Sequence, residues 1–167
     1  LWQNAKVMEA FVKTMGKRIG PKSGTDKMFV IDGEPDAMAA QYGEYFNYFI
    51  LQAYNSSGNS DLNSRFTAQA THFQQYLTPE QVANKLIVCE NFENYAGKGG
   101  VSFRLDNGTT LPSLLGMAYW NPVYNGVTYR KGGVGTYHME YEYTVSGQTG
   151  NYPFLRKAIQ IMNPSIQ

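Results

Sequence analysis

The side chains best suited to acid–base or metal chemistry lie within residues 137–143. If this segment is a β-strand, alternation places His138, Glu140 and Glu142 on one face at steps of about 7 Å. An imidazole and two carboxylates in this arrangement are candidates for divalent metal binding or for proton transfer in a hydrolytic reaction. The same alternation is typical of any half-exposed antiparallel strand, and the sequence contains no further motif with ligand spacing. We therefore expect neither a metal site nor a catalytic centre here, and keep the three residues only as candidates.

The single cysteine, Cys89, is a candidate nucleophile, with His72 or His138 as its base. Reactive cysteines lie at helix N-termini or beside cations, whereas Cys89 follows the apolar residues 86–88 at the far end of a predicted helix. This position favours a buried and unreactive thiol. A lone cysteine also excludes an internal disulfide, so the core must stabilise the fold.

Composition argues against a nucleic-acid-binding or cofactor-binding function. The 167 residues include 14 Lys and Arg against 13 Asp and Glu, a net charge of +1. This balance does not attract nucleic acid, so we expect no nucleic-acid partner. The glycine-rich residues 97–100 and 132–135 lack the pattern of a phosphate-binding loop, and we expect no cofactor. Charged residues are 16% of the chain and aromatic residues 14%, which favours an extracellular, cell-surface or periplasmic location.

Aromatic residues gather in a second region, which the sequence predicts to be loop and strand. They are Tyr119, Trp120, Tyr124 and Tyr129. Aromatic side chains are enriched at protein interfaces, where Lys and Glu are depleted. Their flat apolar faces can also stack on sugars. These four residues are therefore the predicted interface or ligand-binding residues.

Residues 1–20 have the apolar spacing of an amphipathic helix. The residues predicted to pack this helix on a sheet are Met8, Phe11, Val12, Met15 and Ile19. Neither a capping residue nor an acidic first turn precedes Leu1. The helix is therefore expected to continue from an apolar segment further upstream.

Residues 35–88 are predicted to be helical, and one helix start is especially clear. Thr78 can cap a helix, and Gln81 completes a capping box with it. After a glycine-rich stretch the hydrophobic period changes from 3.6 to 2, which indicates strands. Asn107 and Gly108 then supply the two positive-φ positions of a tight hairpin turn.

The second half of the chain is predicted to form the sheet. Further strands are expected at residues 117–120, 127–130 and 136–145. Residues 153–162 fit either a final helix or an edge strand. Helices that precede antiparallel strands make the class α+β. We predict one domain spanning residues 1–167, in which a long N-terminal helix and further helices pack on an antiparallel sheet formed mainly by residues 100–145.

This plan resembles the soluble head of type IV pilins and of the pseudopilins of type II secretion. The shared features are an amphipathic helix that starts without a cap, a variable region, and an antiparallel sheet with a turn such as residues 105–111. The resemblance implies that the first helix continues upstream into a hydrophobic segment and packs onto strands at 101–105 and 137–143. It also implies a filament-forming structural protein whose partners are copies of itself or other secretion subunits. Contact with a membrane would occur only through the upstream segment.

Three functions remain open at this point. The first is a non-enzymatic extracellular or periplasmic assembly subunit that acts through protein–protein contacts. The alternatives are a secreted carbohydrate- or ligand-binding module, and a hydrolase that uses His138, Glu140 and Glu142. The residues that precede Leu1 would separate the first function from the others.

Overall fold

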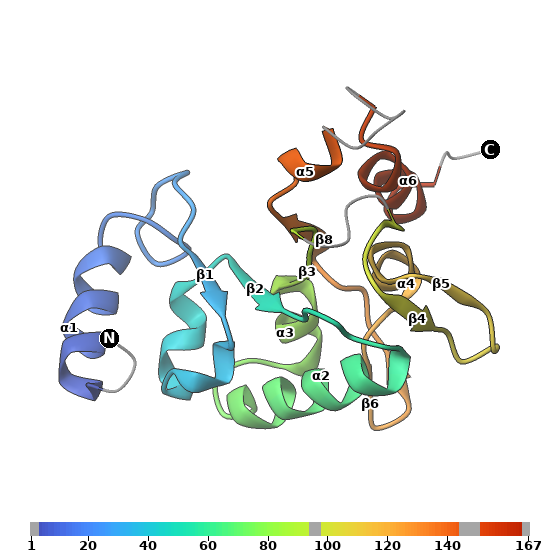
Figure 1. Ribbon diagram of the computed structural model, residues 1–167. Helices are drawn as coiled ribbons and strands as arrows, with labels where there is room; N and C mark the ends of the chain where they lie inside the picture. The colour runs from blue at the N-terminus through green and yellow to red at the C-terminus, as the bar shows by residue number, and fades with distance from the viewer. Residues whose placement is uncertain (1–3, 94–97, 144–150, 165–167) are drawn as a thin grey trace.

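The computed structural model describes residues 4–93, 98–143 and 151–164 and shows an α/β fold (Figure 1). Its centre is a parallel sheet of four strands in the order β1-β2-β3-β8. The strands are β1 (Val30–Gly33), β2 (Tyr48–Gln52), β3 (Leu86–Asn91) and β8 (Gly133–Tyr137). Each strand pairs with the next in this order, so the sheet progresses in one direction without a reversal. This is the strand arrangement of (β/α) barrels, in which active sites lie at the carboxyl ends of the strands.

Helices and two hairpins connect the strands. Before the sheet lies α1 (Ala5–Gly16), and between β1 and β2 lie the 3-10 helices η1 (Pro35–Ala37) and η2 (Ala40–Tyr45). Between β2 and β3 lie α2 (Asn59–Phe73) and α3 (Pro79–Lys85). Between β3 and β8 lie the hairpin β4 (Ser102–Arg104) and β5 (Thr110–Pro112), helix α4 (Ser113–Tyr119), and the hairpin β6 (Val123–Tyr124) and β7 (Val127–Thr128). After the sheet come α5 (Glu140–Tyr143) and α6 (Pro153–Met162). In the described ranges no helix is both long and apolar enough to cross a lipid bilayer.

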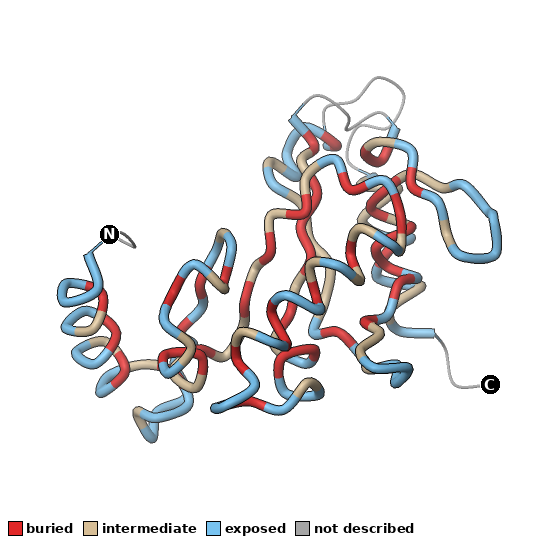
Figure 2. Tube along the Cα trace, turned by 90° about the horizontal axis from the view of Figure 1, so that it is seen from below, coloured by how far each residue is buried: buried red, intermediate tan, exposed pale blue. Residues whose placement is uncertain are grey.

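The two faces of the sheet differ in burial, and burial alternates along the strands (Figure 2). On one face Phe49, Leu51 and Val88 are fully buried in the main core. Phe49 stacks on Phe73 of α2 with ring centroids 5.2 Å apart, which shows that this face is covered by helices. We call the other face the open face; its residues are Val30, Asp32, Tyr48, Ile50, Gln52, Ile87, Cys89, Asn91, Gly133, Gly135 and Tyr137. Apart from the buried Cys89, all of these are exposed or half-exposed.

The antiparallel sheet predicted for residues 100–145 is wrong. This region contributes two short hairpins, α4, α5 and the last strand of a parallel sheet. The error begins at β2, because its short aromatic run fits a buried helix and a parallel strand equally well. Residues 117–120 belong to α4 or follow it. The strand predicted for 136–145 ends at Tyr137, and residues 144–145 lie outside the described residues.

Predictions from caps and turns are mostly confirmed. Thr78 caps α3, and the reciprocal capping box with Gln81 is present. β4 and β5 form the predicted antiparallel hairpin, although Gly108 has a positive φ of 84° and Asn107 does not. The ambiguous segment Pro153–Met162 forms the helix α6.

The N-terminal helix begins with a cap, contrary to the prediction. The Asn4 side-chain oxygen accepts a hydrogen bond from the backbone N–H of Val7 at 3.2 Å, so α1 has an ordinary capped start. Leu1 lies outside the described residues. The helix packs on η2 rather than on the sheet. Gly16 lies so close to the Tyr45 ring that a Cβ atom there would be 2.3 Å from it.

The five predicted packing residues, four in α1 and Ile19 beyond it, therefore contact a different surface from the one expected. Met8 and Val12 are buried, and Met15 and Ile19 are half-buried against the main core. Phe11 is 43% exposed. Its ring makes an edge contact with Phe29, with centroids 6.1 Å apart. Because η2 covers only part of the helix, the predicted apolar stripe is wider than the buried one.

Candidate functional site

Polar and aromatic side chains meet on the open face at the carboxyl ends of the strands. The pairing register aligns Gln52 with Cys89, and Asn91 with Tyr137. Tyr54 lies two residues beyond Gln52, in the turn that follows β2. The rings of Tyr54 and Tyr137 are 6.1 Å apart between centroids. We call this group the carboxyl-end cluster; its members are Asp32, Gln52, Tyr54, Asn91 and Tyr137.

Hydrogen bonds hold the two carboxamides of the cluster in place. The side-chain nitrogen of Gln52 donates to Asp32 Oδ2 at 3.2 Å, across β2 and β1. The side-chain oxygen of Asn91 accepts a hydrogen bond from the backbone N–H of Glu93 at 2.7 Å. Fixed carboxamides beside exposed aromatic rings are suited to binding a polar ligand that also has apolar faces.

Tyr54 and Cys89 both keep their protons at neutral pH. Burial, followed by the neighbouring Cys89 and Asp32 groups, raises the pKa of Tyr54 to about 12. Burial also raises the pKa of Cys89 to about 12. The Tyr54 phenol is therefore a hydrogen-bond donor, and the Cys89 thiol is not a nucleophile, because the thiolate is the reactive form.

The predicted burial of Cys89 is confirmed, although the residue lies in β3 and not at the end of a helix. Its side chain is 7% exposed. The two candidate bases bond elsewhere: His72 Nε2 lies 2.7 Å from the Met38 carbonyl oxygen, and His138 Nδ1 lies 2.6 Å from Glu140 Oε1. In the described structure neither histidine is hydrogen-bonded to the thiol.

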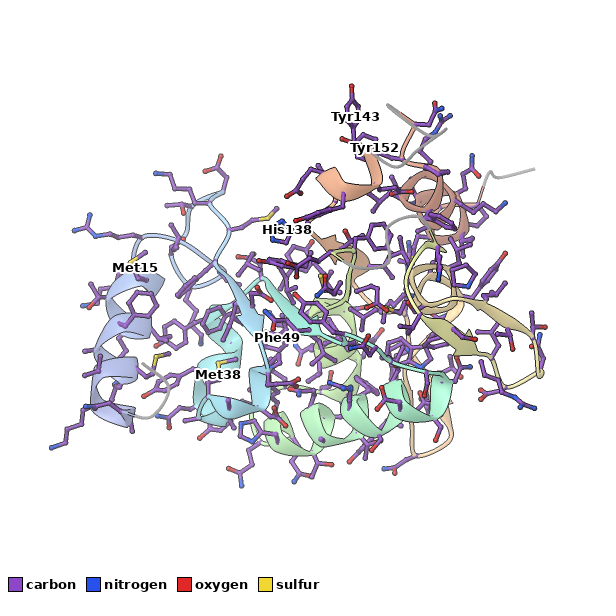
Figure 3. All side chains as sticks on the ribbon, viewed as in Figure 1. Met15, Met38, Phe49, His138, Tyr143 and Tyr152 are labelled. Atoms are coloured by element: carbon purple, nitrogen blue, oxygen red, sulfur yellow. The ribbon has the colours of Figure 1, made fainter. Side chains whose placement is uncertain are left out.

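His138 lies just beyond the carboxyl end of β8 (Figure 3). Its ring contacts those of Tyr137 and Tyr141, with centroids 3.9 Å and 5.4 Å away. The hydrogen bond to His138 lowers the pKa of Glu140, which stays ionised at neutral pH. His138 and Glu140 therefore do come together, through the turn that starts α5 and not through a shared strand face.

Glu142 does not join them. It is a fully buried residue of α5 whose carboxylate accepts hydrogen bonds from the backbone N–H groups of Phe154 and Leu155. These amides belong to the first turn of α6, so Glu142 caps that helix from outside it. Burial raises the pKa of its carboxyl group. The row of three on one strand face is therefore absent, and the described residues contain no group of three His, Cys, Asp or Glu side chains that could hold a metal.

The chain turns sharply after two of the strands that carry the cluster. Asn55, after β2, has φ 61°, and His138, after β8, has φ 58°. Both lie in the left-handed region, which few residues other than glycine adopt and where Asn and His are enriched. Such positions concentrate at functional sites, because the surrounding structure must hold them.

The predicted aromatic binding residues lie away from this edge. Trp120 is 2% exposed and donates its indole N–H to the side-chain oxygen of Asn63 at 2.9 Å. Tyr124 and Tyr129 pack on the buried Phe66. Tyr119 is 52% exposed. Together with Tyr129 it lines a cavity of about 550 Å³ near the start of β8.

The sequence prediction missed Asp32, Gln52, Tyr54 and Asn91 as site residues. A signal was available, since Asp32 and Gln52 directly follow short apolar runs, and Asn91 and Tyr54 lie two or three positions beyond such runs. Polar residues at the ends of buried strands are the pattern of a parallel sheet with a site at its carboxyl edge. The pattern has that meaning only once the strands are known to be parallel.

Comparison with known proteins gives one family. The model of the family GH18_BT1044-like, described as glycoside hydrolase family 18, BT1044-like, matches residues 2–161. Endo-beta-N-acetylglucosaminidase F2 of Elizabethkingia meningoseptica is 29% identical over 164 residues, which are 93% of this chain and 45% of that protein. The chain thus spans less than half the length of this curated relative.

Solved structures agree with this result. A structure of selenomethionine BT1044 with a Glu-to-Gln change has a TM-score of 0.72 at 26% identity and covers 94% of this chain and 44% of its own. Two structures of the endo-beta-N-acetylglucosaminidase from Cordyceps militaris have TM-scores of 0.62 and 0.61 at 24% and 23% identity. One is a double mutant in complex with fucosyl-N-acetylglucosamine-Asn and the other is the apo form; each match covers 92% of this chain and 49% of the other. At these identities the Cordyceps structures support the fold alone.

These findings correct the resemblance to pilins and pseudopilins. An amphipathic helix and an Asn-Gly hairpin occur in many folds; here the helix precedes a parallel sheet and the hairpin lies in the connection between β3 and β8. The family consists of glycoside hydrolases, so the predicted non-enzymatic assembly subunit is wrong. The expected partners, copies of the chain or other filament and secretion subunits, are wrong for the same reason. The alternatives of a carbohydrate-binding module or a hydrolase fit the family better.

Proposed function

The chain belongs to glycoside hydrolase family 18, BT1044-like, and from this membership we propose that its carboxyl-end cluster binds oligosaccharides that contain β-linked N-acetylglucosamine. The observation that supports the site most strongly is the pair of rings, Tyr54 and Tyr137, flanked by the carboxamides of Gln52 and Asn91. The ligand class follows the name of the curated relative, an endo-beta-N-acetylglucosaminidase.

Each member of the cluster has a role in this proposal. Tyr137 is 46% exposed, so its ring face can pack against the C–H face of a pyranose. The carboxamides of Gln52 and Asn91 each offer a donor and an acceptor to hydroxyl or acetamido groups. Tyr54 donates its phenol proton to a sugar oxygen, and Asp32 accepts from a sugar hydroxyl. A mixed set of this kind orients a sugar ring as well as binding it.

In this proposal the carboxyl-end cluster binds and orients the sugar, and hydrolysis is an activity of the whole protein. Glycoside hydrolysis needs a carboxyl group that can protonate the glycosidic oxygen, and in family 18 the substrate itself assists the displacement. Three carboxylates on these strands and on α5 already have other partners: Glu90 and Glu142 accept backbone N–H groups, and Glu140 pairs with His138. Asp32 is the carboxylate of the cluster that remains exposed on the open face.

Calorimetric titration with N,N′-diacetylchitobiose tests the proposal. Cellobiose has the same linkage without acetamido groups and serves as the control ligand. Tyr137→Ala should weaken chitobiose binding about tenfold, because a stacked ring contributes about 1 kcal/mol or more. Tyr119→Ala is the matched control, since Tyr119 is similarly exposed, at 52%, but lies at the distant cavity. Equal binding of both sugars, no binding of chitobiose, or an equal loss in the two variants would contradict the proposal.

The cellular location is a separate proposal. The weakly charged, aromatic-rich composition supports an extracellular, cell-surface or periplasmic protein. Fractionation of the source cells, with the protein detected by antibody, tests it.

A further inference from the structure

Glu90 is a buried carboxylate beneath the carboxyl-end cluster, with no role in the proposed sugar contacts. It lies on β3 but points away from the open face, and it is 0% exposed. Its Oε1 accepts hydrogen bonds from the backbone N–H groups of Asn55 at 3.2 Å and of Asn91 at 2.7 Å. Its Oε2 accepts the hydroxyl of Ser113, which is also fully buried. One carboxylate therefore connects the end of β2, the end of β3 and the start of α4.

The bond to Asn55 fixes the backbone next to Tyr54. The N–H of Asn55 belongs to the peptide group that joins Tyr54 to Asn55, and a peptide group is planar. Holding this N–H therefore fixes the plane that contains the Cα atom of Tyr54, which restricts the directions that the Tyr54 side chain can take. Asn55 has φ 61°, and the N–H of Ser56 closes a turn onto the Ala53 carbonyl at 3.1 Å. The carboxylate thus holds a turn that few residues adopt unaided.

The surroundings of the carboxylate leave it little freedom. Gly100 has φ +104°, and a Cβ atom there would lie 1.9 Å from the Ser113 hydroxyl oxygen and 3.0 Å from Glu90 Cγ. A larger residue at this position would displace the carboxylate or the hydroxyl. Glycine at position 100 therefore matches the close approach that the Glu90–Ser113 contact requires.

We propose that Glu90 is a positioning residue of the site: its carboxylate holds the Tyr54–Asn55 peptide and the Asn91 backbone, and so sets the Tyr54 phenol and the Asn91 carboxamide in the arrangement that binds sugar. This inference rests on the proposed function. It assigns Glu90 no contact with the ligand and no part in proton transfer.

Three variants separate this role from a purely structural one. Glu90→Ala removes both acceptors. Glu90→Gln keeps one oxygen for the two backbone N–H groups, and its new amide can donate to the Ser113 hydroxyl. It should therefore restore the properties that Glu90→Ala loses. Glu142→Ala is the matched control, because Glu142 is also 0% exposed and accepts two backbone N–H groups, but at the start of α6.

Two readouts are needed, besides the melting temperature of each variant. The first is the affinity for N,N′-diacetylchitobiose. The second is hydrogen exchange of the Asn55 amide measured by NMR, which does not depend on any ligand. Glu90→Ala should weaken chitobiose binding and speed Asn55 exchange, each about tenfold, because the Asn55 N–H loses a charged acceptor. Glu90→Gln should restore both, whereas Glu142→Ala should lower the melting temperature and leave both unchanged.

The outcomes can be told apart. If Glu90→Ala does not fold, Ser113→Ala provides the test, with smaller changes in the same direction. Equal loss of chitobiose affinity in Glu142→Ala and Glu90→Ala, or an Asn55 amide that stays protected in Glu90→Ala, would overturn the inference. If the unmodified chain fails to bind chitobiose while Asn55 exchange responds as expected, the proposed function is wrong and the anchoring of the Tyr54–Asn55 peptide by Glu90 is supported.

Discussion

The folded protein should become more stable in alkaline solution, because its buried Lys131 then loses its charge. Lys131 is 3% exposed, and its ammonium group donates to the backbone carbonyls of Ala118, at 2.8 Å, and Trp120. These carbonyls lie at the end of α4, where a cation is favourable. Burial, and next the charge of Arg130, nevertheless lowers the pKa of Lys131 from 10.5 to about 8.

The direction of the effect follows from proton binding. Between pH 8 and 10.5 the unfolded chain keeps the Lys131 proton and the folded chain loses it. Stability therefore rises with pH across this window, and below it the cost of burying the charge is fully present. At about 1.36 kcal/mol for each pH unit, the full gap is worth about 3 kcal/mol.

Urea unfolding followed by circular dichroism, at intervals from pH 7 to pH 10.5, measures this gain. Lys131→Met is the comparison, because Met preserves the bulk of the side chain and cannot titrate. Other lysines and tyrosines titrate in both proteins, so the difference between the two curves reports Lys131. We expect the unmodified chain to gain about 3 kcal/mol relative to Lys131→Met across the window. Parallel curves would refute the reasoning, since they would mean that burial does not disfavour the charged form.

Two further predictions concern the core and the thiol. Met8→Ala should destabilise the fold by about 2–5 kcal/mol, because Met8 is buried. Phe11→Ala should cost only about 1 kcal/mol, because its ring makes an edge contact and the residue is 43% exposed. Equal urea midpoints for the two variants would contradict the packing of α1 on η2. Cys89 in the folded chain should react with iodoacetamide at pH 8 about a thousandfold more slowly than in the unfolded chain, given its raised pKa. Mass spectrometry follows the alkylation, and a native rate within tenfold of the unfolded one would show that the thiol is accessible.

Local signals in the sequence predict local structure well in this protein. Thr78 and Gln81 identify the start of α3, because a capping box needs only residues three apart. The β4–β5 hairpin is predicted for the same reason, since its turn is defined by its own residues. Both features depend on contacts within a few residues and are insensitive to the rest of the fold.

The parallel sheet and its site depend on contacts that a local pattern does not contain. Phe49 is buried because α2 covers it, and nothing in residues 48–52 distinguishes that from burial in a helix. Tyr54 and Tyr137 are 83 positions apart and become neighbours only through the strand order β2-β3-β8. Glu142 is an error in the opposite direction. The sequence pattern predicts an exposed strand residue beside His138 and Glu140, but Glu142 is buried and caps α6.

The most direct test of the central claim is to map where a sugar binds. In an NMR titration of the ¹⁵N-labelled chain with N,N′-diacetylchitobiose, we predict shifts at the backbone amides of Gln52, Tyr54, Asn91 and His138, at the carboxyl ends of three strands. Cellobiose should leave these signals in place. Shifts confined to Tyr119 and the cavity it lines, or identical shifts with both sugars, would contradict an N-acetylglucosamine site on the open face.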